Sequence, residues 1–491
     1  MNKITKRLSR RHFMGQISCA GMGYMTLMNS LLNFKAMNAA AVSNSSPMDD
    51  YKAIVCILQA GGNDSFNTLI PRTDHGQYST TRSNLAIPLD DILPLTGLHN
   101  NKSYGVHPSL SGVRDLYNAG KLSFISNVGT LMAPMTKSEY INKSKKLPLG
   151  LFSHSDQIQQ WQTAIMDRRT ATGWGGKIAD VVSAQNLNQN ISMNVTLSGT
   201  NIFQAGNETV EYAINSGGSI GIDGYDPQSN WIFRKLQTNA VDNMLGQNYQ
   251  DIFKKTYVDT IINSKNAHEI FSSAIAKFRH FEQADEDNPE GALADTFSLG
   301  NRVSQDLKMI ARSIAVSTKE ADNDMADTDT LGFKRQIFFV NFGGWDHHDE
   351  LLDSQVGMLG LLGDALKEFN VGLQQIGMEN KVLTMTTSEF GRTLTSNGDG
   401  SDHAWGGNVM VMGGNNLING QMIYGKYPSL ELGSDDDIGN GVILPTTATD
   451  CYFAEVAKWF GVSHSNISDI FPSLSEFHSI SSNTNPIGFI K

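Results

Sequence analysis

The residues best suited to chemistry lie in the segment GGWDHHDE, residues 343–350. A carboxylate, Asp346, and two imidazoles, His347 and His348, follow a pair of glycines that let the backbone turn sharply. These side chains are typical ligands of a divalent metal ion, which can polarise an ester oxygen and activate a nucleophile. A solvated turn is the alternative interpretation of the same residues.

Further segments offer residues of the same kinds. GGNDSFN carries Asp64, which could bind a metal ion, although an ordinary Asn-Asp turn would explain it as well. In SHSD, Ser153 and Ser155 can cap a helix or supply a nucleophile, and the histidine between them, His154, is a candidate ligand or proton donor. A helix that begins here would also favour an anionic group at its N-terminus.

Two later segments complete the set. SEFGRT offers Glu389 as a metal ligand and Arg392 as a binder of phosphate or sulfate oxygens, unless the two form a surface pair. SDHAWGG offers His403 as a ligand, with Asp402 as a further ligand or as the group that orients it. Five segments with Asp, Glu or His beside predicted strands indicate one shared metal site more strongly than any segment alone.

Apolar runs predict the strands that would position these residues. The runs cover residues 53–60, 122–128, 191–197, 336–342, 381–387 and 407–412. Helical patterns are predicted over residues 155–167, 176–185 and 351–375. A helix between strands implies a parallel crossover, and parallel strands present their carboxyl ends at one edge of a sheet. Ligands of open α/β sheets bind at that edge, so we expect the segments to meet there.

Four regions are predicted along the chain. They are an export signal at 1–41, a first part of an α/β core at 52–199, a mostly helical insertion at 200–330 and a second part of the core at 331–480. Two domains in series are the alternative to an interrupted core.

The export signal contains the twin-arginine motif SRRHFM, an apolar segment interrupted by Lys35, and a cleavage site at Ala39, Ala40 and Ala41. A basic amphipathic helix is the alternative. We expect a periplasmic or secreted protein that meets the twin-arginine translocase during export. No stable membrane anchor is expected, because no stretch is long and apolar enough to span a bilayer.

The charge balance excludes some partners. The chain has 38 basic and 49 acidic residues, a formal charge of -11, and removal of residues 1–41 takes away six basic residues and no acidic ones, which gives -17. Such an acidic chain is not suited to nucleic-acid binding. Two cysteines then remain, Cys56 and Cys451, too few for a disulfide scaffold.

Taken in order, these segments resemble the bacterial family catalogued as domain of unknown function 1501, within the alkaline-phosphatase and sulfatase superfamily. The motifs that carry the resemblance are GGNDSFN, SHSDQ, TGWGGKIAD, GGWDHHDE, SEFGRT, DHAWGG and LPTTATDCYFAEVAKWFGV. The resemblance implies an alkaline-phosphatase-like three-layer α/β sandwich, with a mainly parallel central sheet and a two-metal site at its carboxyl edge.

The resemblance also implies roles for residues. Asp64 would hold one metal beside a serine nucleophile, and Asp346 and His348, joined by His403, would bind the other. Where the superfamily has an Asp-His pair, this chain has Glu389 followed by phenylalanine, which cannot be a ligand.

That departure weakens one metal position unless His154 or His347 substitutes. The Cys/Ser-x-Pro-x-Arg motif of formylglycine sulfatases is also missing, which argues against that class.

The resulting expectation is an exported, metal-dependent hydrolase of phosphate or sulfate esters, with serine or water as the nucleophile. Its substrate would be a small anionic ester or a modified polysaccharide. Mixed oxygen and imidazole ligands suit zinc, manganese or iron better than calcium, with one or two ions. The alternative is a periplasmic scaffold or binding protein that keeps the fold without catalytic activity.

Overall fold

A mostly parallel sheet forms the centre of the chain. The computed structural model describes residues 50–286, 288–289, 291–318, 330–480, 482 and 484–491. The strands of the sheet are β1 Lys52–Leu58, β5 Leu122–Gly129, β6 Asn194–Thr196, β7 Tyr212–Asn215, β8 Gly218–Ser219, β9 Arg335–Asn341, β10 Val382–Thr387, β13 Gly407–Met412, β14 Ile423–Tyr424 and β15 Thr447–Ala448. Within the described residues the order is β14-β5-β13-β10-β1-β9-β6-β7-β8, with β15 beside β5. The predicted mixed α/β fold with a mostly parallel central sheet is confirmed.

Strand β1 occupies the middle of this sheet. It runs parallel to β9 on one side and to β10 on the other. Six of its seven residues are buried, and its apolar sequence KAIVCIL is typical of a parallel strand covered on both faces. Its last residue, Leu58, pairs with Asn341 of β9 and Thr387 of β10, so the three carboxyl ends lie level.

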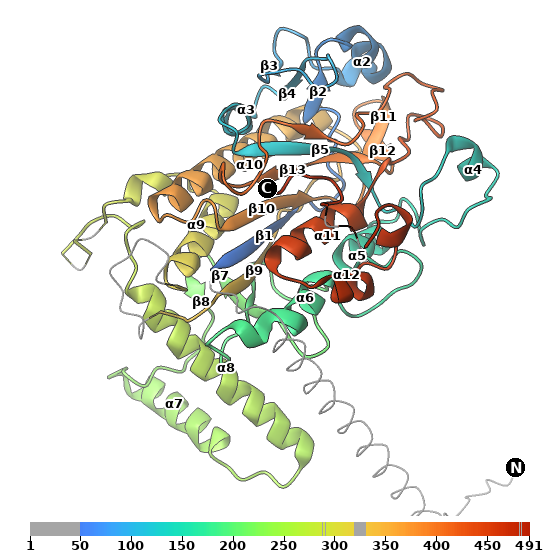
Figure 1. Ribbon diagram of the computed structural model, residues 1–491. Coiled ribbons are helices and arrows are strands. Elements are labelled where there is room, and N and C mark those ends of the chain that lie inside the picture. Colours follow the sequence, from blue (N-terminus) through green and yellow to red (C-terminus); the bar gives the residue numbers. More distant parts are fainter. Residues whose placement is uncertain (1–49, 287, 290, 319–329, 481, 483) are drawn as a thin grey trace, which may run out of the picture. The chain divides into compact units, whose positions relative to one another are not determined.

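Helices cover both faces of the sheet (Figure 1). They are α2 His75–Arg82, α3 Ser111–Asn118, α4 Lys137–Ile141, α5 His154–Thr163, α6 Trp174–Val182, α7 Ile232–Leu245, α8 Ile252–Ala276, α9 Arg302–Ala315, α10 Leu351–Gln375, α11 Thr449–Phe460 and α12 His464–Ile470. Helices α3 and α9 pack against α10, while α5 and α12 pack against α6. The chain from Met48 to Lys491 forms one compact unit.

Two small sheets lie beside the central one. One contains β2 Leu69–Pro71, β3 Leu93–Pro94 and β4 Tyr104–Val106. The other is the hairpin of β11 Arg392–Ser396 and β12 Ser401–His403. Strands this short leave no periodic apolar pattern, and the sequence did not predict them.

The segment expected to be a helical insertion, residues 200–330, contains α7, α8 and α9. It also contains β7 and β8, which extend the edge of the central sheet. Eleven of the fourteen residues of α9 are buried, so this helix belongs to the core. Helices α7 and α8 form a hairpin that extends away from the sheet (Figure 1).

The twin-arginine motif and the expected cleavage site lie outside the described residues. Among the helices that are described, none has the length and apolar character needed to cross a bilayer. Cys56 and Cys451 are both buried and free.

Candidate metal centre

Segments from distant parts of the chain meet at the carboxyl edge of the sheet. The loops after β1, β9 and β10 begin side by side, because these three strands end level with one another. Strand β5 also ends at this edge, since it is antiparallel to β13, which is antiparallel to β10. The chain that follows β5 leads to α5, and β12 leads into β13. Every segment with candidate ligands therefore reaches the same region.

Two glycines allow the loops to approach closely. Gly61 and Gly62 have φ values of +123° and +82°. A Cβ atom on Gly61 would lie 2.4 Å from the backbone nitrogen of Asp346, and one on Gly62 would lie 2.4 Å from the ring of Phe390. Only glycine combines this conformation with this contact distance. The glycine pair thus fixes how near the loop after β9 lies to the loop after β1.

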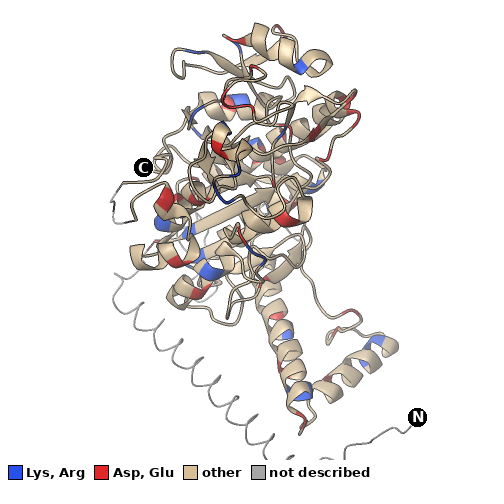
Figure 2. Cartoon of the chain, turned by 90° about the vertical axis from the view of Figure 1, so that its right-hand side faces the viewer, with Lys and Arg blue, Asp and Glu red and all other residues tan. Residues whose placement is uncertain are grey.

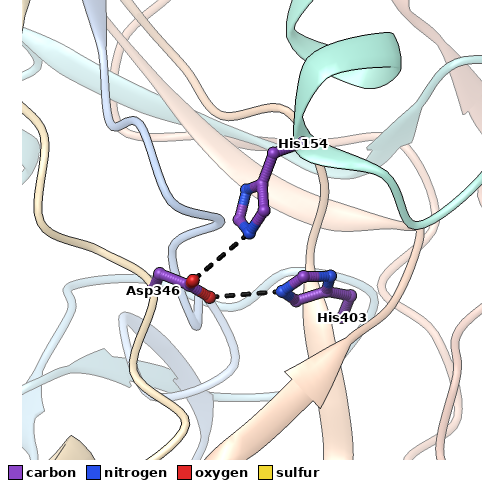
Figure 3. A group of neighbouring side chains, drawn as sticks. All are labelled: His154, Asp346 and His403. Carbon is purple, nitrogen blue, oxygen red and sulfur yellow. Dashed lines mark hydrogen bonds and ion pairs between the residues drawn. The ribbon is translucent and has the colours of Figure 1, made fainter.

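His154, Asp346 and His403 form a cluster whose potential ligand atoms all lie within 4.8 Å of one another. Figure 3 shows both imidazole rings directed toward the Asp346 carboxylate from different elements. Nε2 of His154 is 3.3 Å from Oδ2, and Nε2 of His403 is 3.2 Å from Oδ1. His348 adjoins the group, with its Nε2 3.1 Å from Asp346 Oδ1 and 2.9 Å from Nε2 of His403.

The rings of His154 and His403 are oriented by oxygen atoms that accept hydrogen bonds from Nδ1, on the side of each ring away from Asp346. The Nδ1 of His403 donates to the carbonyl oxygen of Phe152 at 2.8 Å, and the Nδ1 of His154 donates to Oε1 of Glu389 at 2.8 Å. Because Nδ1 carries the proton, the lone pair of each neutral ring is on Nε2. Nε2 of His154 is buried without a hydrogen bond, although it faces Asp346.

His348 repeats this arrangement. Its Nδ1 lies 3.2 Å from Oδ1 of Asp402, which also accepts a hydrogen bond from Asn397 at 3.1 Å. Asp402 therefore orients His348, whereas the sequence offered it as a ligand or as the partner of His403. All three histidines thus present Nε2 to the same carboxylate.

The pKa values in the cluster favour a carboxylate anion. Partial burial alone would raise the pKa of Asp346, but the hydrogen bond and charge of Arg392, together with His403 and His154, lower it to about 2. The hydrogen bond to Glu389 raises the pKa of His154, and burial lowers the pKa of His403.

Glu389 was expected to be a metal ligand, and the structure gives it a different position. Its side chain is fully buried, and its Oε1 accepts from the backbone N–H of Gly61 at 2.7 Å as well as from His154. Within the described residues no hydrogen bond reaches Oε2, which is buried too. Through Oε1, Glu389 positions His154 from behind.

Arg392 was expected to bind an anionic ester, but its guanidinium is buried and occupied. Nε donates to Gly62 O at 2.9 Å, Nη1 to Ser401 O at 2.7 Å, and Nη2 to Gly61 O at 2.6 Å. Nη2 also donates to Asp346. In this arrangement Arg392 ties three loops together and holds the Asp346 carboxylate.

Asp64 lies apart from the cluster. Its Oδ2 accepts from Arg82 Nη2 at 2.6 Å and from Ser401 Oγ at 3.0 Å, and both members of the ion pair are buried. Arg82 also donates to the carbonyl oxygen of Thr393 at 2.9 Å. Asp64 and Arg82 therefore hold the β11–β12 hairpin, which carries His403. No sequence motif distinguishes Arg82 from a surface arginine, so its role was missed.

The remaining expected residues also lie outside the cluster. The ring of His347 is buried beside Trp345, with centroids 6.1 Å apart, and burial lowers the pKa of His347. Ser153 is the N-cap of α5 but makes no side-chain capping bond. Its Oγ lies 3.2 Å from Oγ of Ser155, and no described hydrogen bond links either hydroxyl to the cluster.

Phe390 closes one side of the centre. Its ring centroid lies 4.9 Å from that of His154 and 4.6 Å from that of His403. The phenyl ring therefore packs against both imidazole rings.

Comparison with known proteins gives the family. The chain matches the family described as "Protein of unknown function (DUF1501)" over residues 51–439. The chain belongs to the DUF1501 family. No curated protein matches it. Among solved structures it is similar to Ps i-CgsB, crystallised in complex with k-i-k-neocarrahexaose, at 10% sequence identity and a TM-score of 0.32, over 89% of this chain and 78% of that chain. A similarity this low carries no argument about function.

The donor set of this DUF1501 protein fits a divalent metal ion. Ligand atoms placed tetrahedrally about 2.0–2.1 Å from zinc lie roughly 3.3 Å apart. The distances from the imidazole nitrogens to the carboxylate oxygens, 3.1 to 3.3 Å, agree with that spacing, whereas Nε2 of His348 and Nε2 of His403 are closer to each other, at 2.9 Å. Imidazole rings that are hydrogen-bonded at Nδ1, with Nε2 directed to a common point, are typical of metal-binding histidines.

Proposed function

We propose that this protein is an exported metal-dependent hydrolase of phosphate or sulfate esters. The observation that carries the proposal is the common orientation of His154, His348 and His403. Each ring presents Nε2 to Asp346 while an oxygen atom holds its Nδ1. A metal centre needs several imidazole nitrogens directed at one point, and this orientation supplies them.

One ion fits this centre better than two. Phe390 stands where the superfamily resemblance expects a metal-binding histidine, and Asp64 is already bound to Arg82. A bound divalent ion polarises an ester oxygen and lowers the pKa of the attacking nucleophile. Imidazole nitrogens with one carboxylate suit zinc, iron or manganese rather than calcium.

The chain's own residues would hold and orient the reacting groups. Asp346 stays anionic beside Arg392, and Glu389 keeps the Nε2 of His154 directed inward. Water is better supported than serine as the nucleophile, because the hydroxyls of Ser153 and Ser155 face each other.

We also propose that the fold belongs to the alkaline-phosphatase and sulfatase superfamily. A mostly parallel sheet with the candidate centre at its carboxyl edge supports membership of the alkaline-phosphatase and sulfatase superfamily. The twin-arginine motif supports export to the periplasm or beyond. Sequencing the N-terminus of the mature protein tests this proposal, because we expect cleavage after Ala41.

Metal content and hydrolysis measured together test the function. We expect about one equivalent of zinc, iron or manganese and hydrolysis of an aryl phosphate or aryl sulfate, since the site has three or four protein ligands and an open position. Asp346→Asn should lose the metal and lower kcat/KM by at least about a hundredfold, because it removes the only carboxylate of the cluster. Asp349→Asn, at an exposed aspartate in the same loop, is the matched control and should change neither.

A folded protein that binds no metal and cleaves neither class of ester would contradict the proposal. A second candidate, a periplasmic binding or scaffold protein, is favoured by Phe390, which replaces a potential ligand. Metal bound without hydrolysis in a broad ester screen would support this second function instead.

A further inference from the structure

Among the described helices longer than ten residues, α7 buries the fewest side chains. Only Thr238 of its fourteen residues is buried, and its Oγ1 accepts a hydrogen bond from the backbone N–H of Asp226 at 3.0 Å. The side of α7 that carries Thr238 therefore faces its own chain. The hairpin of α7 and α8 extends away from the rest of the molecule in Figure 1 and in Figure 2, which leaves the opposite side of α7 open to a partner.

That open side carries a row of apolar side chains. Four of them follow one another at intervals of four residues and a phenylalanine adjoins them, so all five lie on one face of the helix. These residues, which we call the α7 stripe, are Ile232, Phe233, Leu236, Ala240 and Met244. The four larger side chains of the stripe are 57–60% exposed. A projecting apolar face of this kind is typical of a surface that binds a partner.

Two charged side chains beside the stripe are available to such a partner. Within the described residues, the side chain of Lys235 makes no hydrogen bond or ion pair, and the carboxylate of Asp242 accepts only from the hydroxyl of Tyr225, at 3.0 Å. Seven residues make nearly two turns, so Lys235 and Asp242 lie on the same side of α7, about 10 Å apart. At that distance they do not pair with each other within one chain.

The order of these two charges is unusual for a single helix. Lys235 lies in the first turn of α7 and Asp242 in the last. The helix dipole favours the reverse, with acidic side chains near the N-terminus and basic ones near the C-terminus. A second α7 running in the opposite direction would explain the order, because Lys235 of each copy would then lie beside Asp242 of the other.

The α7 stripe has the symmetry that such a pairing requires. Ile232 and Met244 lie six residues on either side of position 238, and Leu236 and Ala240 lie two residues on either side of it. The two charged residues lie three residues before and four residues after the same position. Interfaces about a twofold axis are self-complementary in this way, since the same patch meets its own copy.

We infer that two copies of this chain dimerise through an antiparallel pair of α7 helices, each covering the α7 stripe of the other. The start of α7 lies at the end of the hairpin opposite to the turn (Figure 1). An antiparallel pair therefore places the two central sheets at opposite ends of the dimer, which keeps two chains of formal charge -11 apart. The inference does not depend on the proposed hydrolase activity.

The two hairpins can approach each other without strong repulsion. Residues 220–270 contain five basic and six acidic side chains, so each hairpin is nearly neutral. For the same reason an anionic membrane is not the favoured occupant, because the hairpin offers it no net positive charge. A helix of fourteen residues is only about 21 Å long, and Asn243 interrupts the stripe. We therefore expect a small interface and a dimer that dissociates on dilution.

Sedimentation equilibrium of residues 42–491, which contain the whole compact unit, measures dimerisation over a range of protein concentrations. The fraction of dimer should rise with concentration. Leu236→Ser should raise the dissociation constant at least about tenfold, because the interface loses one leucine from each copy. Leu98→Ser is the matched control, since Leu98 is 69% exposed and lies outside α7, and it should dimerise like the unaltered chain.

An exchange of charges tests the antiparallel direction. Lys235→Glu and Asp242→Lys should each raise the dissociation constant about three- to tenfold, because each change places like charges beside each other twice in the interface. The double variant with both changes should dimerise like the unaltered chain, since opposite charges face each other again. Such a recovery arises between copies, because the two positions are too far apart to interact within one helix.

A chain that stays monomeric at every concentration, or a Leu236→Ser variant that dimerises like the control, would overturn the inference. A double charge variant that does not recover dimerisation would overturn the antiparallel pairing. Monomers that bind vesicles of phosphatidylcholine, and lose this binding in Leu236→Ser, would assign the stripe to a membrane instead. Thermal unfolding checks that each variant is folded.

Discussion

At the scale of single residues, one buried carboxylate decides which nitrogen of His154 faces the cluster. Glu389 accepts from His154 Nδ1 and from the backbone N–H of Gly61 with the same oxygen. Glu389→Gln keeps the shape but removes the charge that favours this tautomer. We expect metal affinity to fall about ten- to a hundredfold, as for other groups that orient metal-binding histidines. Competition with a chromophoric chelator measures it.

Glu431→Gln is the control for this change, because Glu431 is exposed and lies outside the candidate centre. An unchanged affinity in Glu389→Gln would show that the His154–Glu389 hydrogen bond does not serve a metal site. Circular dichroism of both variants separates a local effect from a loss of folding.

The residue types of the centre could be predicted from sequence, but the roles of their atoms could not. Asp346, His348, His403 and His154 were all expected near a metal, and the structure brings them together. Glu389 has the right chemistry for a ligand, yet both contacts of its Oε1 turn it into an orienting group. Which oxygen or nitrogen faces a common point depends on loop geometry, and sequence spacing carries no information about that geometry.

At the scale of elements, the β11–β12 hairpin depends on a buried ion pair. Arg82, at the end of α2, bonds to Asp64 and to the carbonyl oxygen of Thr393. Arg82→Met leaves the Asp64 carboxylate buried without its partner, which costs about 3–5 kcal/mol of unfolding free energy. Urea unfolding measures this loss.

The control is Lys102→Met, which breaks the exposed pair of Lys102 with Asp74. An exposed pair contributes about 0–1 kcal/mol, so the control should unfold near the unaltered chain. Equal midpoints for Arg82→Met and Lys102→Met would contradict a structural role for the buried pair.

Long elements were predictable and short ones were not. The helix expected over residues 351–375 coincides with α10, and the strand expected over 122–128 differs from β5 by one residue. Both elements have a long periodic apolar pattern, so their local sequence already indicates the structure that tertiary packing then stabilises. Residues 191–197 gave a strand of three residues, β6, because the side chains of Ser192 and Thr196 accept hydrogen bonds from the backbone N–H groups of Asn194 and Ser198 and form turns there. Strands of two or three residues, such as β12, form only because another element holds them.

At the scale of the whole molecule, stability should depend on pH through Asp450. Burial raises the pKa of Asp450 to about 8, despite a hydrogen bond from the backbone N–H of Ser473 and the charge of Lys177. The folded protein therefore keeps a proton that the unfolded chain releases near pH 4. The stability that this group contributes is present below pH 4 and falls as the pH rises to about 8, by up to about 1.4 kcal/mol per unit.

Asp450→Asn should reduce this slope, so that the variant gains stability relative to the unaltered chain between pH 5 and pH 9. Part of the slope should remain, because burial also raises the pKa of Glu455. Unfolding by urea at several pH values checks the prediction, with Asp223→Asn as the exposed control. Parallel pH profiles for Asp450→Asn and the control would contradict the raised pKa.

The backbone contact at Gly61 also limits how such a protein can diversify. Because the turns after β1 and β9 touch without intervening side chains, lengthening one would displace the other and separate His154, Asp346 and His403. New specificities would then have to arise in the surrounding loops, such as the one between β5 and α5 or the tip of the β11–β12 hairpin. Natural variation and laboratory selection should therefore concentrate insertions there and leave the two glycines unchanged.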